Sequence, residues 1–92
     1  MTKKIHKNKL NSYNKNIGKN IKYYRKIRNI SQLEVATTLG IDKSTISLYE
    51  NGKVNIPVKH LYAISKFLNI EIELFFEAYE HKFKHIYDYQ YL

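Results

Sequence analysis

The chain has 92 residues and a mass of 11.0 kDa, enough for one small domain with an arm or tail and too few for two lobes around a substrate cleft. Its 43% apolar residues argue against wholesale disorder, the absence of cysteine excludes disulfides, thiolate metal sites and cysteine nucleophiles, and the longest charge-free stretch has seven residues, too short to span a bilayer. Sixteen Lys and Arg against eight Asp and Glu give a net charge of +8, which favours a polyanionic partner.

The first sixteen residues are rich in lysine and asparagine and show no sustained hydrophobic period, so residues 1–16 are expected to form a mobile basic arm. No apolar stretch follows the first lysines, which argues against a secretory signal. Residues 1–33 contain ten Lys and Arg and no acid, whereas residues 70–92 carry a net charge of −3. A positive field at the N-terminal half suits nucleic acid, with a solvated tail as the alternative. A membrane partner is not expected, because the arm has too few large apolar side chains to embed.

The first helix is expected over about residues 17–28. Ile17, Ile21 and Tyr24 recur at the spacing of one helix face, which Arg28 continues. No segment alternates apolar and polar residues for long enough to predict a strand. The sequence therefore predicts an all-α chain.

Two further short helices are expected on either side of a glycine turn. Ser31 and Glu34 have the spacing of a capping box at the start of a helix over residues 32–39, and the glycine after that helix permits a sharp exit. Asp42 is the expected N-cap of a helix over residues 43–50.

Turn signals divide the remaining sequence. Asn51 and Gly52 predict a turn, and Pro57 suits the first turn of a fourth helix. The inward stripe of that helix is expected to contain Leu61, Ile64 and Leu68. Further apolar side chains from Ile72 onward are expected to begin a fifth helix.

The two helices around Gly40 form the most informative unit. Ala36 is expected where they approach closely, and Ile46 and Tyr49 are expected to face the core. The residues left to point outward are Lys43, Ser44, Ser47 and Leu48. An exposed short helix of this kind fits the major groove of DNA, where its N-terminal residues reach base edges. An ordinary pair of core helices is the alternative.

A wider resemblance covers about residues 17–76. The matching segments are IGKNIKYYRKIRNISQLEVATTLGIDKSTISLYENGK and IPVKHLYAISKFLNI. This region resembles the helix-turn-helix domain of phage repressor and Cro-type regulators, the XRE family. The features that carry the resemblance are the Ser-Gln that opens the second helix, the spacing of Ala36 and Gly40, and the Glu-Asn-Gly-Lys that follows the next helix. This resemblance implies a five-helix repressor-like helix-turn-helix domain over residues 17–76, between the basic N-terminal arm and a helical aromatic C-terminal extension over residues 77–92.

The resemblance also implies roles for individual residues. Base contacts are implied for Lys43, Ser44, Ser47 and Leu48, with Ser47 nearer the groove edge. Backbone contacts are implied for Gln32, Thr45, Asn51 and Lys53, and Gln32 also braces the recognition helix. Arg25 and Glu50 correspond to a structural ion pair. Leu48 would favour a thymine methyl group, and the hydroxyl of Tyr49 needs a partner or a route to solvent.

Aromatic side chains dominate residues 77–92. They extend a helical stripe that contains Phe76, Tyr79, Phe83, Ile86 and Tyr87. This stripe either packs on its own domain or forms the interface of a two-fold homodimer. We favour the dimer interface, because five small helices already close a core and leave the stripe uncovered.

Neither a metal site nor a catalytic site is expected. His81 and His85 lie four positions apart, and Glu77 lies one turn earlier on the same helix face. The two histidines have no third strong ligand and no neighbouring groups that would orient them around a metal ion. There is no glycine-rich phosphate loop, and the serines have no histidine at a suggestive position. We therefore expect no cofactor, no metal and no enzymatic activity.

The sequence thus predicts a cytoplasmic, sequence-specific regulator that binds double-stranded DNA. The expected form is a dimeric repressor that reads the major groove with helix 43–50. The alternative is an antitoxin or other protein-interaction module that neutralises a co-encoded partner, with DNA binding secondary. A restriction-modification controller is a third interpretation, which the sequence does not separate from a repressor.

Overall fold

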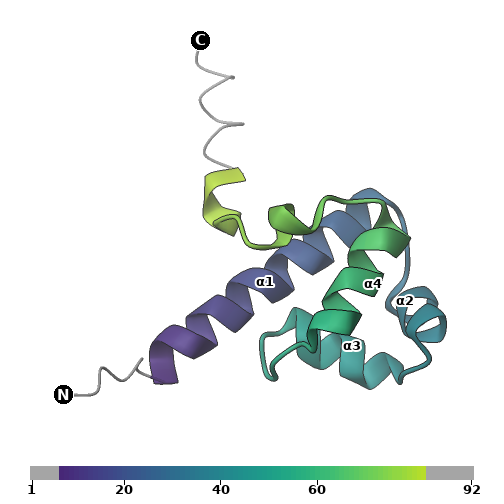
Figure 1. The fold of residues 1–92 in the computed structure, drawn as a ribbon, viewed down its shortest axis with the longest axis horizontal. Helices are drawn as coiled ribbons and strands as arrows, with labels where there is room; N and C mark the ends of the chain where they lie inside the picture. The colour runs from purple at the N-terminus through teal and green to yellow at the C-terminus, as the bar shows by residue number, and fades with distance from the viewer. Residues whose placement is uncertain (1–6, 83–92) are drawn as a thin grey trace, which may run out of the picture.

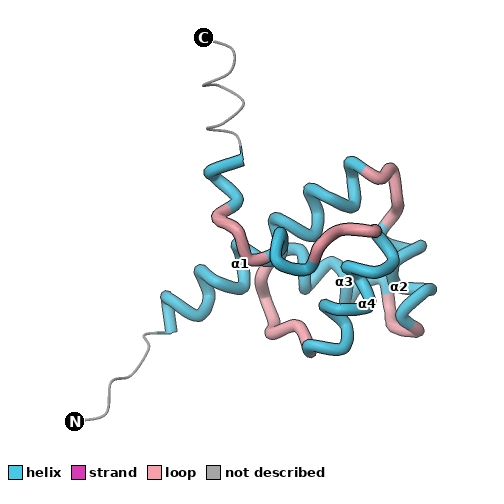
Figure 2. The backbone as a smooth tube through the Cα atoms, turned by 45° about the horizontal axis from the view of Figure 1, so that its top comes forward, coloured by secondary structure: helices cyan, strands magenta, loops and turns pink. Residues whose placement is uncertain are grey.

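The computed structural model describes residues 7–82, which form four α-helices and one 3₁₀-helix and contain no strand. The elements are α1 (Lys7–Ile27), α2 (Gln32–Leu39), α3 (Lys43–Glu50), α4 (Val58–Leu68) and the 3₁₀-helix η1 (Ile72–Phe75). The long helix α1 runs through the molecule, and the three shorter α-helices gather beside its C-terminal half (Figure 1). Short loops join them, as the backbone trace in Figure 2 shows. The expected five-helix, all-α fold is confirmed.

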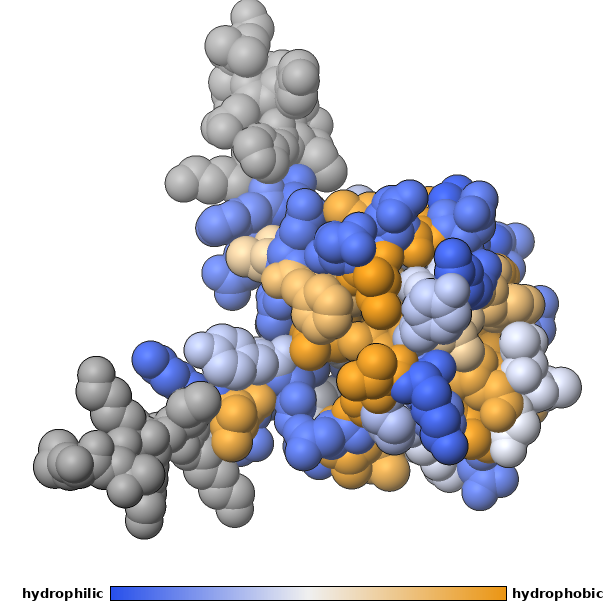
Figure 3. Space-filling model, in the orientation of Figure 1, coloured by the Kyte–Doolittle hydropathy of each residue, from blue (hydrophilic) through white to orange (hydrophobic). Residues whose placement is uncertain are grey.

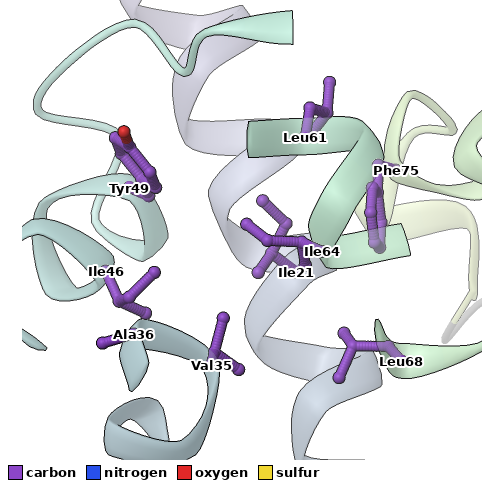
Figure 4. Packing of buried hydrophobic residues seen from close by; sticks show 9 residues of the cluster. All are labelled: Ile21, Val35, Ala36, Ile46, Tyr49, Leu61, Ile64, Leu68 and Phe75. Carbon is purple, nitrogen blue, oxygen red and sulfur yellow. The ribbon is translucent and has the colours of Figure 1, made fainter. Parts of the chain in front are cut away.

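All five elements contribute to one apolar core. The buried cluster consists of Ile21, Val35, Ala36, Ile46, Tyr49, Leu61, Ile64, Leu68 and Phe75 (Figure 4). Ile21 of α1, Ile46 of α3 and Ile64 of α4 are completely buried. Burying one such side chain contributes about 1.5–3 kcal/mol, so these short helices are stabilised mainly by packing against one another.

The ends of α2 follow from local sequence signals. Ser31 Oγ accepts from the backbone N–H of Glu34, and a carboxylate oxygen of Glu34 accepts from the N–H of Ser31, which completes the expected capping box. Gly40 ends α2 in the left-handed region at φ 70°. Asp42 occupies the N-cap position of α3, but its side chain makes no capping hydrogen bond, so that part of the expectation is wrong.

The ends of α4 are held differently. Pro57 immediately precedes the helix, and Asn69 ends it in the left-handed region at φ 54°. Arg28, expected as the last residue of the first helix, lies one residue beyond the end of α1. Its guanidinium donates to the carbonyl oxygens of Leu68 at 2.9 Å and Asn69 at 3.1 Å. Arg28 therefore satisfies carbonyl groups that the end of α4 leaves open.

The structure corrects the expected start of the first helix. α1 begins at Lys7, so residues 7–16, which were expected to belong to a mobile arm, are helical. This N-terminal half of α1 stands out from the body of the molecule (Figure 3). Residues 1–6, the remainder of the expected arm, lie outside the described residues.

Contacts with distant parts of the chain explain the longer helix. Asn14 Nδ2 donates to Asn55 Oδ1 at 2.8 Å, and Asn16 bonds the backbone near Glu77. The backbone of Lys15 lies directly against Gly52. These contacts stabilise a segment that has no acidic residue in its first turn and no apolar period of its own.

The structure also corrects the expected fifth helix. A helix was expected to begin at Ile72 and to continue through Phe76 into the C-terminal extension, but η1 ends at Phe75, and helical structure resumes only at Tyr79. The carbonyl oxygens of Phe75 and Glu77 accept hydrogen bonds from asparagine side chains of α1. These carbonyl groups therefore have partners outside the helix, which interrupts the helical hydrogen-bond ladder.

Candidate nucleic-acid interface

The inner side of α3 is fixed in the core. Ile46 is completely buried and Tyr49 is 4% exposed, and both belong to the core cluster. Ala36, on the facing side of α2, is also buried, as expected for a close approach of the two helices. With this side anchored, the opposite side of α3 is turned outward.

The outward side of α3 combines a cation, hydroxyl groups and one apolar side chain. Lys43 and Ser44 are exposed, and Leu48 is 42% exposed. Thr45 and Ser47 are partly buried beside them. Hydroxyl and ammonium groups can bond base edges, and a leucine can contact a thymine methyl group, so this surface carries the chemistry of major-groove readout.

A buried polar network holds the C-terminal end of α3. Arg25 Nε donates to Glu50 Oε2 at 2.6 Å and Arg25 Nη2 donates to Glu50 Oε1 at 3.0 Å, which gives the bidentate ion pair implied by the resemblance. Gln32 Nε2 donates to Glu50 Oε1 at 2.9 Å. The carboxylate of Glu50 thus ties α1 and the start of α2 to α3. Gln32 braces the outward helix, as expected.

The loop after α3 lies next to the same surface. Asn51 Nδ2 donates to the carbonyl oxygen of Ser47 at 2.8 Å and approaches Ser47 Oγ at 3.4 Å, so Asn51 restrains the residue expected at the groove edge. Lys53 is exposed. Gly52 adopts φ 65°, and a Cβ at this position would lie 2.6 Å from the Cα of Lys15. Only glycine allows the loop to approach α1 so closely.

The hydroxyl of Tyr49 has the partner that it was expected to need. Tyr49 Oη lies 2.8 Å from His60 Nδ1 of α4. In Figure 4 the hydroxyl end of Tyr49 points away from Ile46 and Ala36. Burial raises the pKa of the Tyr49 phenol above its ordinary value of 10.0. His60 had no role in the sequence analysis, because its partner lies eleven positions away on another helix.

A row of lysines on α1 was not predicted from the sequence. Lys15, Lys19, Lys22 and Lys26, called here the lysine stripe, recur at the spacing of one helix face, and all four are exposed. Within residues 9–82 none of them forms an ion pair. The stripe begins at Lys15, beside Gly52 of the loop that follows α3. The helical spacing was visible in the sequence, but residues up to 16 were assigned to an arm.

The expected aromatic stripe is only partly described. Phe76 is 53% exposed. Tyr79 packs on α1 of its own domain, with its ring centroid 5.9 Å from that of Tyr23 in an edge-to-face arrangement. Phe83, Ile86 and Tyr87 lie outside the described residues.

Residues 7–82 contain no group of three or more His, Cys, Asp or Glu side chains that could hold a metal ion. Glu77 and His81 belong to this part of the chain, whereas His85 lies outside it. None of the helices between Lys7 and Lys82 is both long and apolar enough to cross a membrane.

The sequence of the chain matches a known protein family. The sequence profile of the family described as Helix-turn-helix matches residues 21–75, more than half of the chain. The chain therefore belongs to the helix-turn-helix family, of the phage repressor and Cro (XRE) type. It is a DNA-binding transcriptional regulator, which is a role without enzymatic chemistry.

Two relatives match at similar identity. An uncharacterized HTH-type transcriptional regulator of Methanocaldococcus jannaschii is 38% identical over 53 residues, which cover 58% of this chain and 80% of the relative. The antitoxin PezA of Streptococcus pneumoniae is 39% identical over 54 residues, which cover 59% of this chain. The chain spans only 34% of the length of that antitoxin.

Two solved structures share the fold. The restriction-modification controller protein C.AhdI of Aeromonas hydrophila has a TM-score of 0.63 at 24% identity, over 67% of this chain and 94% of that protein. A hypothetical transcription factor, NHTF, from Neisseria has a TM-score of 0.70 at 17% identity, over 91% of this chain and 94% of that protein. At these identities the likeness establishes the fold alone.

Proposed function

We propose that the protein is a dimeric repressor that reads a near-palindromic operator with the outward side of α3. The observation that carries the proposal is the contrast between the two sides of this helix. One side is locked by Ile46, Tyr49 and the Arg25–Glu50 ion pair, and the other presents an exposed Lys43, Ser44 and Leu48. A rigidly held helix is suited to recognise a DNA sequence when its exposed polar groups can bond base edges and an exposed apolar side chain can contact a thymine methyl group.

Each group on this surface is assigned a part in the proposal. Base contacts are made by Lys43, Ser44, Ser47 and Leu48. Backbone contacts are made by Gln32, Thr45, Asn51 and Lys53. The lysine stripe adds further phosphate contacts beside Gly52, since it continues the same positive surface. Phosphate contacts of this kind supply most of the affinity and a steep dependence on salt.

The proposed dimer forms through the aromatic extension after η1. Its interface consists of Phe76, Tyr79, Phe83, Ile86 and Tyr87. The exposure of Phe76 supports this assignment, since large exposed aromatic side chains are typical of interfaces. Two copies of α3 would then enter successive major grooves about 34 Å apart. Because its partner is the DNA of the cell or of a phage, the proposal places the protein in the cytoplasm.

Competition binding against randomised duplexes tests the proposed contacts. Lys53→Ala is expected to weaken binding to all sequences alike, because a phosphate contact carries no sequence information. Ser44→Ala and Leu48→Ala are expected to change the preferred sequence, by about 1–3 kcal/mol at the base pair concerned. An unchanged preference in both variants would exclude α3 as the reading element.

The second candidate function is an antitoxin that neutralises a co-encoded protein. The identity to PezA favours it, although the match covers only about a third of that relative. A chain that ends at Glu77 distinguishes the two functions, because it retains every residue of the core cluster. A monomer that still binds single half-sites supports the repressor proposal. A variant that remains dimeric but no longer binds the product of a neighbouring gene supports the antitoxin.

A further inference from the structure

Two asparagines of α1 hold the segment that leaves the domain after η1. Asn16 Nδ2 donates to the carbonyl oxygen of Glu77 at 2.9 Å, and Asn16 Oδ1 accepts from the backbone N–H of Tyr79 at 2.8 Å. Asn20, one turn later, donates through Nδ2 to the carbonyl oxygens of Phe75 and Glu77, both at 2.8 Å. We call Asn16 and Asn20 the asparagine clamp. It fixes the backbone on both sides of the break between η1 and Tyr79.

Asn20 holds the backbone after η1 at a cost in stability, because its side chain is buried with one polar atom unpaired within the described part of the chain. Asn20 is completely buried, yet its Oδ1 has no hydrogen-bond partner among the described residues. A buried acceptor without a donor is unfavourable. An apolar side chain would avoid this cost, but it would not bond the carbonyl groups of the turn.

The same stretch of α1 also fixes the end of the reading helix. Gly18 packs against the carbonyl groups of Tyr49 and Glu50, where a Cβ would lie 2.6 Å from Glu50 O. Asn14 bonds Asn55 of the following loop. Residues 14–20 of α1 therefore hold α3 and its loop on one side and the start of the C-terminal extension on the other.

We infer that Asn16 and Asn20 are positioning residues that set which spacing of operator half-sites the dimer accepts. This inference rests on the proposed dimerisation through the extension. If the extension joins two copies, the direction in which it leaves each domain determines the distance and rotation between the two α3 helices. The clamp fixes that direction relative to α3 through one rigid helix. Without the clamp, the link between domains becomes flexible, and a flexible link tolerates a range of spacings.

The test measures binding of the full chain to duplexes with two identical half-sites and a spacer of varied length. For the wild type, a shift of five base pairs, half a helical turn, is expected to weaken binding about 100-fold, because only one half-site can then be occupied well. Asn16→Ala removes both hydrogen bonds of a half-buried side chain and is expected to reduce this penalty to under about tenfold. The matched control is Asn11→Ala, an exposed asparagine on the same helix, which should keep the full penalty.

A second variant and a second measurement separate positioning from folding. Asn16→Asp keeps an acceptor for the N–H of Tyr79 but loses the donor to Glu77, so its penalty is expected to lie between those of the wild type and Asn16→Ala. Affinity for a single half-site should stay within about twofold in both variants, since the reading surface is unchanged. A folding defect would instead lower that affinity together with the helical circular dichroism signal.

The outcomes distinguish the inference from the proposed function. If Asn16→Ala retains the wild-type spacing penalty, the asparagine clamp does not set the spacing, and the inference is overturned while the dimeric regulator stands. If the wild type binds without any dependence on a second half-site, dimerisation on DNA is contradicted, and the inference falls with it.

Discussion

Tyr49 and Arg25 contribute to stability through polar contacts that hold α3 in place, in addition to apolar packing. Tyr49 extends from the core to His60, and Arg25 reaches Glu50 from α1. Both are polar groups placed where burial makes an unpaired partner costly. Their removal should therefore lower stability by amounts that the loss of apolar contact alone does not explain.

Tyr49→Phe keeps the ring and removes the hydrogen bond to His60. At neutral pH it is expected to lower the free energy of unfolding by about 1 kcal/mol. Because burial raises the pKa of Tyr49, the folded state holds this proton more tightly than the unfolded state. The stability from this site is complete below pH 10 and is lost as the pH rises through the folded-state pKa.

Urea unfolding of the wild type and Tyr49→Phe at pH 7 and pH 11 measures this effect. The difference between the two proteins should shrink at the higher pH, since the Tyr49 phenol is the one titratable group in which they differ. Tyr62→Phe, at a 54% exposed position, is the control and should show no such change. An equal difference at both pH values would contradict the role assigned to burial.

Arg25→Ala is expected to cost about 3–5 kcal/mol, because it leaves the buried carboxylate of Glu50 without its cation. The exposed neighbour Lys26 supplies the control, and Lys26→Ala should change stability by no more than about 0.5 kcal/mol. The free energies of unfolding of both variants and the wild type, measured in urea, test this prediction. A loss below about 1 kcal/mol for Arg25→Ala would mean that the pair behaves as a surface ion pair.

At the scale of elements, α1 and α3 are held together by backbone contact. Gly18 lies inside α1, where alanine would be the better helix former by about 1 kcal/mol. A Cβ there would meet carbonyl oxygens of Tyr49 and Glu50, and backbone atoms cannot rotate away as a side chain can. The close approach is therefore expected to outweigh helix propensity.

Gly18→Ala should destabilise the fold by up to about 2 kcal/mol net, because overpacking a packed site costs about 1–3 kcal/mol and the better helix propensity of alanine offsets about 1 kcal/mol of that cost. It should also weaken DNA binding, since it displaces the end of α3. Ser12→Ala, at an exposed position of the same helix, is the control and should leave both quantities unchanged or slightly raise stability. A more stable Gly18→Ala protein would show that α3 can shift without cost.

The helices whose ends were predicted correctly are those whose caps and turns are formed by residues close to one another in the sequence. Ser31, Glu34 and Gly40 define the ends of α2 within ten residues, and the same unit identifies the outward side of α3. The start of α1 and the break after η1 depend instead on partners 41 to 63 positions away in the chain. Local periodicity contains no information about such contacts, so the first helix was predicted too short and the fifth too regular.

The candidate site divides in the same way. The outward position of Lys43, Ser44 and Leu48 followed from helical spacing alone. The hydrogen bond of Gln32 to Glu50, 18 positions away, required the tertiary structure, whereas Asn51 bonds Ser47 only four positions away, at the end of α3.

At the scale of the whole molecule, the positive charge lies along α1 as well as near α3. The lysine stripe continues from the loop at Gly52 along an exposed face of α1. A surface of this length would neutralise several phosphates in addition to those near α3. The salt dependence of DNA binding should therefore exceed what the α3 region alone provides.

Replacement of each stripe lysine by glutamine tests this extension. The slope of the logarithm of the binding constant against the logarithm of salt concentration should fall by about 0.9 for every lysine that contacts a phosphate. Lys66→Gln is the control of equal charge, since Lys66 lies over Tyr62 near the end of α4, outside the lysine stripe. Four stripe variants that behave like Lys66→Gln would remove α1 from the interface.

Methylation interference on a duplex selected from a random pool tests whether α3 lies in the major groove. Methylation of guanine N7 blocks the major-groove edge, whereas methylation of adenine N3 blocks the minor groove. We predict that N7 methylation abolishes binding at two clusters of guanines about one helical turn, or 10 base pairs, apart. Binding that tolerates N7 methylation throughout the site, or no binding of duplex DNA at low salt, would contradict the account.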